Sequence, residues 1–408
     1  MANASKTAFR IAGFGMVEGI GGYWINDQEA VQAGAQPDGF FFTGQPSKPL
    51  FAAVRTPSVA YCIALRLADG QRAYGDCMTV ANLGLGGRPD PLRIDALPDI
   101  AKRLRQKLEG ASFDGFRKAC AMLDDWPEDL GGRPVAYGLS QAFLNAAALA
   151  SGMTPADVLR HEYGIDRVYE RPGFAASCGS DWHKNADKAI ARRVAMLPHA
   201  AMQTADECRR LPEYASWITN RIRELMPSDY QPDLHFDFHA SLGRMFDNDE
   251  ARVIDDRGDV VQRTQGYRVY FEDPLFARGA QEAAERARRL RERLQASGVD
   301  CRLIADEWAN APGEMALFTG SQAVHGIQIK VPDNGPLTTT IEGLRLCQKD
   351  QVLAYLGGSC NETDISVRTT VHVGLAFGAW RLFTKPGLGL DEGLMILTNE
   401  LNRAEAGL

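Results

Sequence analysis

The pattern of hydrophobic and polar positions changes near residue 168 and divides the chain into two regions. Before this point, strand-like runs at 59–67 and 72–77 alternate with Gly- and Pro-rich loops and helical segments, which predicts an α+β domain. After it, short apolar runs are each followed by a longer helical pattern. These runs are DLHFDFH (233–239), YRVYFED (267–273), CRLIADE (301–307), GIQIK (326–330) and VLAYLGG (352–358). Such alternation over some 240 residues predicts parallel strands joined by helices, in a (β/α)8 barrel or a doubly wound sheet.

Several other segments have recognisable patterns. Residues 138–150 are nearly all apolar and helix-forming, which predicts a buried helix too short to cross a membrane. In 279–298, Glu and Arg alternate at helical spacing, which predicts an exposed helix. The Gly-rich pieces 13–22 and 84–87 lack the strand-to-helix context of a dinucleotide fingerprint, so we interpret both as loops. The aromatic residues 40–42 fit either a lid over the barrel or plain packing.

Composition narrows the choice of partners and compartment. The 408 residues include 45 Lys and Arg against 52 Asp and Glu, a net charge of -7 that argues against a nucleic-acid partner. The chain has no membrane-length apolar run, and its N-terminus has no apolar signal region, so we expect a cytoplasmic protein without a membrane partner. Eight scattered cysteines without a CxxC motif argue against a zinc ribbon, an iron–sulfur cluster or a disulfide framework.

Four of the strand-like runs carry a charged residue at or near their end. These residues are Asp237, Glu272, Asp306 and Lys330, separated by 35, 34 and 24 positions, which is close to one strand-helix repeat each time. Residues that end successive strands of a parallel barrel converge on its C-terminal mouth, where barrel enzymes place their catalytic groups. We therefore expect three carboxylates and one lysine to meet there.

The chemistry of this cluster favours a hard metal ion and a base. Three carboxylates suit Mg2+, which prefers oxygen ligands, and the metal is expected to lower the pKa of Lys330. Mg2+ with a lysine base can remove a proton α to a carboxylate. Period-two alternation places Gln328 on the same strand face as Lys330. His235 and His239 flank Asp237 and could instead indicate a transition-metal site, but we favour hydrogen-bonded polar fillers inside the barrel.

Ordered motifs along the whole chain resemble a known family. The strings LHFDFH, FEDP, IADEW, HGIQIKVPD, GGSCNETD and KPGLGLDEG resemble the enolase superfamily, and within it the 3-methylaspartate ammonia-lyase family. DGFFFTG (38–44), YGDC (74–77), GGRPDP (86–91) and MLPHA (196–200) extend the resemblance. It implies an N-terminal α+β capping domain at 1–162, a modified (β/α)8 TIM barrel of the enolase type at 163–408, and a homodimer.

The resemblance also implies a reaction. The expected activity is Mg2+-dependent β-elimination of ammonia from L-threo-3-methylaspartate, or a close β-substituted aspartate, to give mesaconate. That activity belongs to amino-acid degradation and glutamate metabolism. The implied cofactor is Mg2+, with a monovalent cation such as K+ as an activator, and the implied ligand is a small amino-diacid.

Carried over motif by motif, the resemblance assigns roles to individual residues. Asp237, Glu272 and Asp306 become the Mg2+ ligands. Lys330 becomes the base that takes the proton from C3, and His199 becomes the base on the opposite face, in contact with the metal-bound carboxylate. The residues implied to contact the substrate are His199, Gln328, Ser359 and Cys360.

The sequence departs from the family pattern at positions near the substrate. Ala176 stands where the family has a Gln that contacts substrate, Ser359 replaces Thr, and Phe383 stands where a smaller aliphatic residue is expected. An unpaired polar group or altered space can redirect specificity. These departures leave open an enolase-superfamily dehydratase or racemase acting on another carboxylate. A non-catalytic binding protein on the same fold is a further alternative, disfavoured because a buried charge cluster is costly to keep without chemistry.

Overall fold

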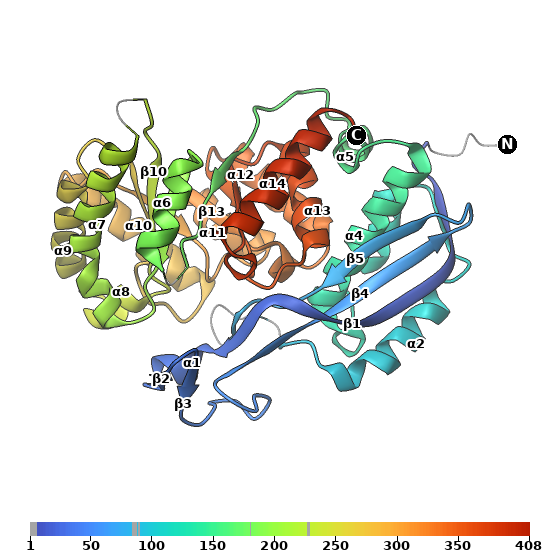
Figure 1. Cartoon of the computed structure of the whole chain (residues 1–408), viewed down its shortest axis with the longest axis horizontal. Helices are drawn as coiled ribbons and strands as arrows, with labels where there is room; N and C mark the ends of the chain where they lie inside the picture. The colour runs from blue at the N-terminus through green and yellow to red at the C-terminus, as the bar shows by residue number, and fades with distance from the viewer. Residues whose placement is uncertain (1–5, 84–87, 89, 180, 227–228) are drawn as a thin grey trace.

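A computed structural model describes residues 6–83, 88, 90–179, 181–226 and 229–408 of the chain. It contains a barrel ringed by helices and, beside it, an antiparallel sheet packed against helices (Figure 1). The sheet and its helices come from the N-terminal part of the chain, and the barrel comes from the C-terminal part. The expected loop at 84–87 lies outside the described residues.

The N-terminal sheet is built around two long antiparallel strands. Its strand order is β5-β4-β1-β6, and β7 also pairs with β1. The strands are β1 (Phe9–Asp27), β4 (Arg55–Leu67), β5 (Arg72–Cys77), β6 (Asn82–Leu83) and β7 (Ser112–Phe113). A separate hairpin is formed by β2 (Gln36–Asp38) and β3 (Phe41–Thr43).

The expectation of a loop at 13–22 is wrong, because this Gly-rich stretch lies inside β1. It pairs with β4 along most of its length, and Phe14 and Met16 are buried at alternate positions. The glycines permit close contact with β4, since a Cβ on Gly19 would lie 2.6 Å from the Sγ of Cys62. Close strand packing, not turn formation, accounts for the glycines there.

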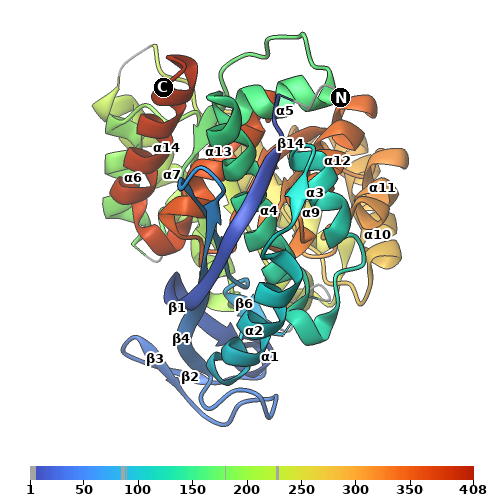
Figure 2. The same cartoon turned by 90° about the vertical axis from the view of Figure 1, so that its right-hand side faces the viewer.

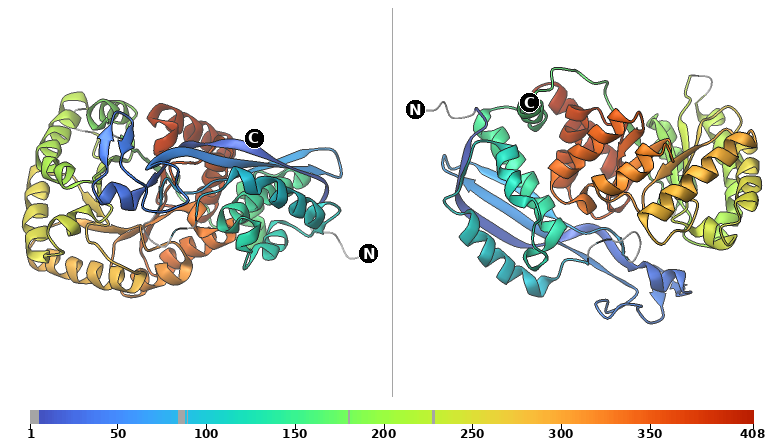
Figure 3. Two further views of the ribbon diagram at one scale, coloured as in Figure 1. Left: turned by 90° about the horizontal axis from the view of Figure 1, so that it is seen from below. Right: turned by 180° about the vertical axis from the view of Figure 1, so that it is seen from behind.

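Helices cover one side of this sheet, as Figure 2 shows for α2 and α4. The helices of the N-terminal part are α1 (Gln28–Gln32), α2 (Leu97–Leu108), α3 (Phe116–Cys120), α4 (Gly132–Ser151) and α5 (Pro155–Tyr163). The apolar segment 138–150 lies in α4 and is buried as expected. Seen from below, the segment that carries α1 and the β2–β3 hairpin lies across one end of the barrel (Figure 3, left).

Eight parallel strands close the barrel in the order β10-β11-β12-β13-β14-β15-β8-β9, which excludes the doubly wound sheet. The strands are β8 (Gly173–Ala175), β9 (Met196–Ala201), β10 (Asp233–Asp237), β11 (Val269–Glu272), β12 (Arg302–Ala305), β13 (Gly326–Ile329), β14 (Leu353–Leu356) and β15 (Arg381–Phe383). The helices are α6 (Trp182–Ala191), α7 (Ala205–Leu225), α8 (Ser241–Met245), α9 (Glu250–Arg263), α10 (Ala280–Ala296), α11 (Pro312–Gly320), α12 (Leu337–Lys349), α13 (Asp364–Phe377) and α14 (Leu390–Glu405). The five expected strands thus correspond to β10 to β14.

Alternation along the strands separates two apolar cores. Leu234 and Phe236 of β10 belong to the large core between the barrel wall and its helices. Tyr270, Ile304 and Tyr355 belong to a small core inside the barrel. Polar side chains at inward positions above this small core therefore face the barrel mouth.

Two further findings bear on the expectations from composition. Among the described residues, no helix is long and apolar enough to span a membrane. All eight cysteines are free thiols.

The contact between α4 and the N-terminal sheet depends on two glycines. A Cβ on Gly75 of β5 would lie 2.1 Å from the carbonyl oxygen of Gly138 in α4, and a Cβ on Gly138 would lie 2.3 Å from the Sγ of Cys77. Because the first of these collisions is with backbone, a side-chain rotation cannot relieve it.

We predict that Gly75→Ala lowers the free energy of unfolding by about 3 kcal/mol, because the added methyl group forces α4 away from the sheet. Gly313→Ala is the matched control, since no atom lies within 4 Å of its new Cβ and the position lies in α11. The control should leave stability unchanged or raise it by up to about 1 kcal/mol. Chemical denaturation of the variants measures both values, and equal stabilities would refute the prediction.

Candidate active site

A cavity of about 490 Å³ lies at the C-terminal mouth of the barrel, between the barrel and the N-terminal part of the chain. It is lined by most of the residues expected from the sequence: His199, Asp237, Asp306, Gln328, Lys330, Ser359 and Cys360. Glu272 is fully buried and lies behind this wall. The other wall includes Tyr23, Phe40 and Arg55. The structure therefore brings the residues of separate strands together, as barrel geometry predicts.

The three expected metal-binding carboxylates come from consecutive strands. Asp237 ends β10, Glu272 ends β11 beside it in register, and Asp306 directly follows β12. Each is at most 2% exposed. Burial raises the pKa of all three, and for Asp237 the charges of Glu272 and Asp306 raise it further. Such a cluster is stable as carboxylates only with compensating positive charge.

Lys330 supplies part of that charge. It directly follows β13, and its Nζ forms an ion pair with Oδ2 of Asp306. Burial and Arg88 disfavour the ammonium, but Asp306 and Glu307 outweigh them, so the pKa of Lys330 is raised. The expected lowering of this pKa was attributed to a bound metal ion, so it stays a prediction for the metal-bound site.

Glu272 accepts three hydrogen bonds that fix its orientation. Gln328 donates from Nε2 at 2.5 Å, the hydroxyl of Tyr355 donates at 2.5 Å, and Nε2 of His235 lies at 2.8 Å. Gln328 and Lys330 therefore share the inner face of β13, as their spacing predicts. His235 is the hydrogen-bonded filler that we favoured from sequence.

His199 lies in β9 on another side of the cavity. Its Nδ1 lies 3.2 Å from Nδ1 of His235, and its Nε2 lies 3.6 Å from Oδ2 of Asp237. Its ring packs against Phe383, with 4.5 Å between the ring centroids. Burial lowers the pKa of His199 far below its ordinary value, and nearby His235, His239 and Lys330 lower it further. His199 is therefore neutral and able to accept a proton.

Two groups of potential metal donors lie close together in this region. One donor atom from each of His199, His235 and Glu272 lies within 4.8 Å of the others. Asp273, Asp306 and Glu307 form a second, all-carboxylate group by the same measure. Among the described residues, His235 shares a group with His199 and Glu272, and His239 belongs to neither group. The carboxylates keep the oxygen-rich character that suits Mg2+.

The positions that depart from the family pattern lie in different surroundings. Ala176 is packed in the core between barrel and helices, whereas the next residue, Ser177, lines the cavity. Phe383 also lines the cavity and ends β15. The Oγ of Ser359 donates to Glu362, and burial raises the pKa of Cys360 to about 12, so its thiol stays protonated.

Comparison with known proteins agrees with this geometry. A family model described as methylaspartate ammonia-lyase N-terminus matches residues 9–164, and one described as methylaspartate ammonia-lyase C-terminus matches residues 167–408. The chain belongs to the methylaspartate ammonia-lyase family. Methylaspartate ammonia-lyase 1 of Carboxydothermus hydrogenoformans is 36% identical over 96% of this chain and 95% of its own length. The methylaspartate ammonia-lyase of Clostridium tetanomorphum is 35% identical over 95% of this chain and 96% of its own length.

Solved structures of this family share the fold closely. The Citrobacter amalonaticus methylaspartate ammonia lyase containing (2S,3S)-3-methylaspartic acid has a TM-score of 0.92 and 35% identity over 97% of this chain and 99% of its own. A Mg complex of β-methylaspartase from Clostridium tetanomorphum has a TM-score of 0.88 and 34% identity over 98% of each chain. A muconate lactonizing enzyme from Pseudomonas fluorescens, 16% identical with a TM-score of 0.66, shares the fold alone. The enolase-like fold expected from the sequence is confirmed.

Arg88 is a charged residue of the site that the sequence analysis missed. Its side chain is fully buried and pairs with Glu307 at 2.5 Å and Asp333 at 3.2 Å, with Asp306 at 3.9 Å. It belongs to the string GGRPDP, which carried the family resemblance, so the motif itself held the only sign of its importance. Arg88 links the N-terminal part of the chain to the acidic barrel mouth.

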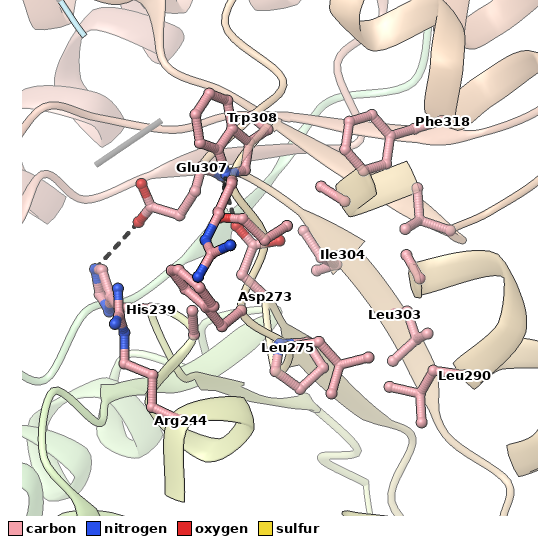
Figure 4. Close-up of a pocket in the computed structure, with 18 of the residues that line it drawn as sticks. His239, Arg244, Asp273, Leu275, Leu290, Leu303, Ile304, Glu307, Trp308 and Phe318 are labelled. Carbon is pink, nitrogen blue, oxygen red and sulfur yellow. Dashed lines mark hydrogen bonds and ion pairs between the residues drawn. The ribbon is translucent and has the colours of Figure 1, made fainter. Parts of the chain in front are cut away.

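A second cavity of about 320 Å³ adjoins the first (Figure 4). Apolar side chains such as Leu290, Leu303 and Phe318 line much of it. His239 lines both cavities, and its Nε2 lies 3.9 Å from Oε1 of Glu307 in the second. The contact between His239 and Glu307 therefore stands between the polar cavity and its apolar neighbour.

We predict that Arg88→Gln lowers the free energy of unfolding by about 3 kcal/mol, because it leaves Glu307 and Asp333 buried without their cation. Arg66→Gln is the control, since Arg66 is exposed and donates to the backbone carbonyl of Ala12. Chemical denaturation at neutral pH measures both. Equal stability of the two variants would show that Arg88 is not needed for charge compensation.

The same variant should change the pH dependence of stability. Burial opposes ionisation of Glu307, but Arg88 outweighs it and holds its pKa at about 2. In the unfolded chain, the pKa of a glutamate is about 4.3. Because the pKa of Glu307 is lower in the folded state, its ionisation stabilises the fold above about pH 4.3, and this stabilisation is lost as the pH falls towards 2. The stability difference between wild type and Arg88→Gln should therefore shrink between pH 5 and 2.

Proposed function

We propose that the protein catalyses Mg2+-dependent β-elimination of ammonia from L-threo-3-methylaspartate, or a close β-substituted aspartate, to give mesaconate. The observation that carries this proposal is the position of three buried strand-end carboxylates and Lys330 at the barrel mouth, where Asp237, Asp306 and Lys330 line one cavity. Membership of the methylaspartate ammonia-lyase family supports the reaction, a carbon–nitrogen lyase activity. The relatives solved with methylaspartic acid and with Mg support the substrate and the cation.

The donor set fits a divalent cation. Asp237, Glu272 and Asp306 are the residues that would hold Mg2+, and their pKa values are raised by burial, which shows unmet demand for positive charge. Oδ1 of Asp306 is buried without a hydrogen-bond partner in the described structure. When bound, Mg2+ would stabilise the negative charge that develops on the substrate carboxylate as C3 loses its proton. A monovalent cation such as K+ is the proposed activator.

Lys330 and His199 are the proposed bases, on opposite sides of the cavity. A bound cation would compete with Lys330 for Asp306, so the ammonium form of Lys330 would be favoured less. Neutral Lys330 would then accept the C3 proton on one face of the substrate. His199 is neutral and can accept a proton without prior deprotonation. Two bases on opposite faces would allow both C3 epimers to react, each with its own base.

The remaining proposed substrate contacts are Gln328, Ser359 and Cys360, which all line the cavity. Gln328 also donates to Glu272, so it would connect substrate position to the metal-binding carboxylate. Cys360 would act as a neutral contact, because its raised pKa disfavours the thiolate.

We propose that the chain divides into a capping domain at 1–162 and a barrel domain at 163–408. The boundary falls at the end of α5, ten residues before the first barrel strand, and the two family models meet in the same region. We also propose a homodimer that works in the cytoplasm without nucleic-acid or membrane partners. The free cysteines suit a reducing compartment, and light scattering tests the dimer.

We predict that purified protein with threo-3-methylaspartate, Mg2+ and K+ releases ammonium. Ultraviolet absorbance should rise at the same time, because the product is a conjugated diacid. EDTA should abolish both changes, because the carboxylate cluster then lacks its cation. Absence of turnover while calorimetry shows bound Mg2+ would contradict the proposed substrate and favour a dehydratase or racemase on another carboxylate.

The assignment of two bases predicts that each of two substitutions lowers activity on a different epimer of the substrate. Lys330→Ala should lower kcat for one C3 epimer of 3-methylaspartate by about 10²- to 10⁴-fold, and His199→Ala should do so for the other epimer. Steady-state kinetics with each epimer measures this pattern. Full activity of both variants on both epimers would show that neither residue is the base.

A further inference from the structure

The charges around the catalytic cavity raise the question of how an anionic substrate is received. Four carboxylates line the cavity: Asp181, Glu207, Asp237 and Asp306. Lys330 and Arg55 are its cationic lining residues, while burial lowers the pKa of both lining histidines. A substrate with two carboxylates therefore needs a second cationic contact besides the metal, for the carboxylate that the metal does not hold.

Of these two cations, Lys330 already has an ion-pair partner in Asp306. Arg55 lies in β4, on the opposite wall, and forms no ion pair with any carboxylate of the described residues. Its Nε donates to the neutral Oδ1 of Asn26 at 2.7 Å, and its Nη1 donates to the carbonyl of Phe40. Arg88, by contrast, is surrounded by three carboxylates.

The guanidinium of Arg55 is held in a fixed orientation. Its Cζ lies 4.5 Å from the ring centroid of Phe40 and 4.7 Å from that of Phe42. Two hydrogen bonds and two aromatic faces restrict a side chain that is otherwise flexible. Arg55 is thus a half-buried, oriented cation without a countercharge, which is the usual form of a carboxylate-binding residue.

Arg55 and Cys360 both line the cavity. Tyr23 also lines the cavity. Burial raises the pKa of Tyr23, Arg55 lowers it and Cys360 raises it, so both residues lie near Tyr23. The proposed metal-binding carboxylates lie at the ends of barrel strands, whereas Arg55 comes from β4 of the N-terminal sheet. A substrate with one carboxylate at those strand ends would extend its other carboxylate towards Arg55.

We propose that Arg55 binds the C1 carboxylate of the amino-diacid substrate, the carboxylate remote from the reacting C3 carbon, and so sets the requirement for a diacid. The inference rests on the proposed function, in which the metal holds the C4 carboxylate. The capping domain would then contribute a charged contact with the substrate in addition to enclosing it. Loss of this contact removes recognition of the second carboxylate and leaves the metal and both bases in place.

The test compares binding of two product-like ligands by calorimetry in the presence of Mg2+. The ligands are mesaconate and its monoamide at the carboxyl group remote from the methyl group, which corresponds to C1 of the substrate. Wild type should bind the diacid about 10- to 100-fold more tightly than the monoamide, as expected for a charge-assisted hydrogen-bonded pair. Arg55→Gln should reduce this ratio to near 1, and Arg55→Lys should keep part of it.

Arg66→Gln, on the same strand but outside the cavity, is the matched control and should retain the wild-type ratio. A ratio unchanged in Arg55→Gln, or equal weakening of both ligands, would overturn the proposal, because a merely structural role of Arg55 affects both ligands alike. If the Arg55 variants give such a result while the wild type turns over methylaspartate, only the role of Arg55 is overturned. Absence of both turnover and mesaconate binding in wild type would overturn the proposed function together with it.

Discussion

The structure depends on the burial of several carboxylates at one end of a parallel barrel. Asp237, Glu272, Asp306 and Glu307 are each at most 5% exposed, and taking such groups out of water is costly unless cations and hydrogen bonds compensate. The barrel supplies Lys330 and the hydrogen bonds to Glu272. These are insufficient for full compensation, since burial still raises the pKa of the first three acids. The same deficit of positive charge that makes the cluster unstable alone suits it to bind a cation.

This electrostatic demand explains why barrel and N-terminal part form one functional unit. Arg88, which pairs with Glu307 at the barrel mouth, comes from the N-terminal part. Backbone contacts reinforce the connection, since the amide of Ala81 donates to the carbonyl of Ser359 at 2.8 Å and that of Gly22 donates to Asn361. The N-terminal part is therefore fixed to the barrel loop that carries Ser359 and Cys360, the proposed substrate contacts. Sequestration from water and charge compensation come from the same contacts.

The sequence predicted those features that follow from local periodicity. Inward and outward alternation around Asp237 and Gln328, together with the spacing of strand ends, was enough to place the acidic cluster and its lysine. Features that depend on contacts between residues far apart in the chain could not be predicted from the sequence. The glycines of 13–22 look like a loop until β4 is present to pair with them, and the pKa of Lys330 depends on a direct contact with Asp306. Arg88 required knowledge that a segment outside the barrel reaches into its mouth.

The site combines two parts with different tolerance to change. The residues proposed for chemistry lie on or directly after barrel strands, where backbone hydrogen bonds on both sides fix their positions. Arg55 and Phe40 come from the N-terminal part of the chain and Ser177 follows β8, so these lining residues lie outside the acidic cluster. Substitution in the second group can alter the fit of a substrate without disturbing the acids and their cations. Of the departures of this chain from its family pattern, Ser359 and Phe383 line the cavity, and Ala176 is packed in the core next to the lining residue Ser177. We therefore expect them to alter substrate preference and leave the reaction itself unchanged.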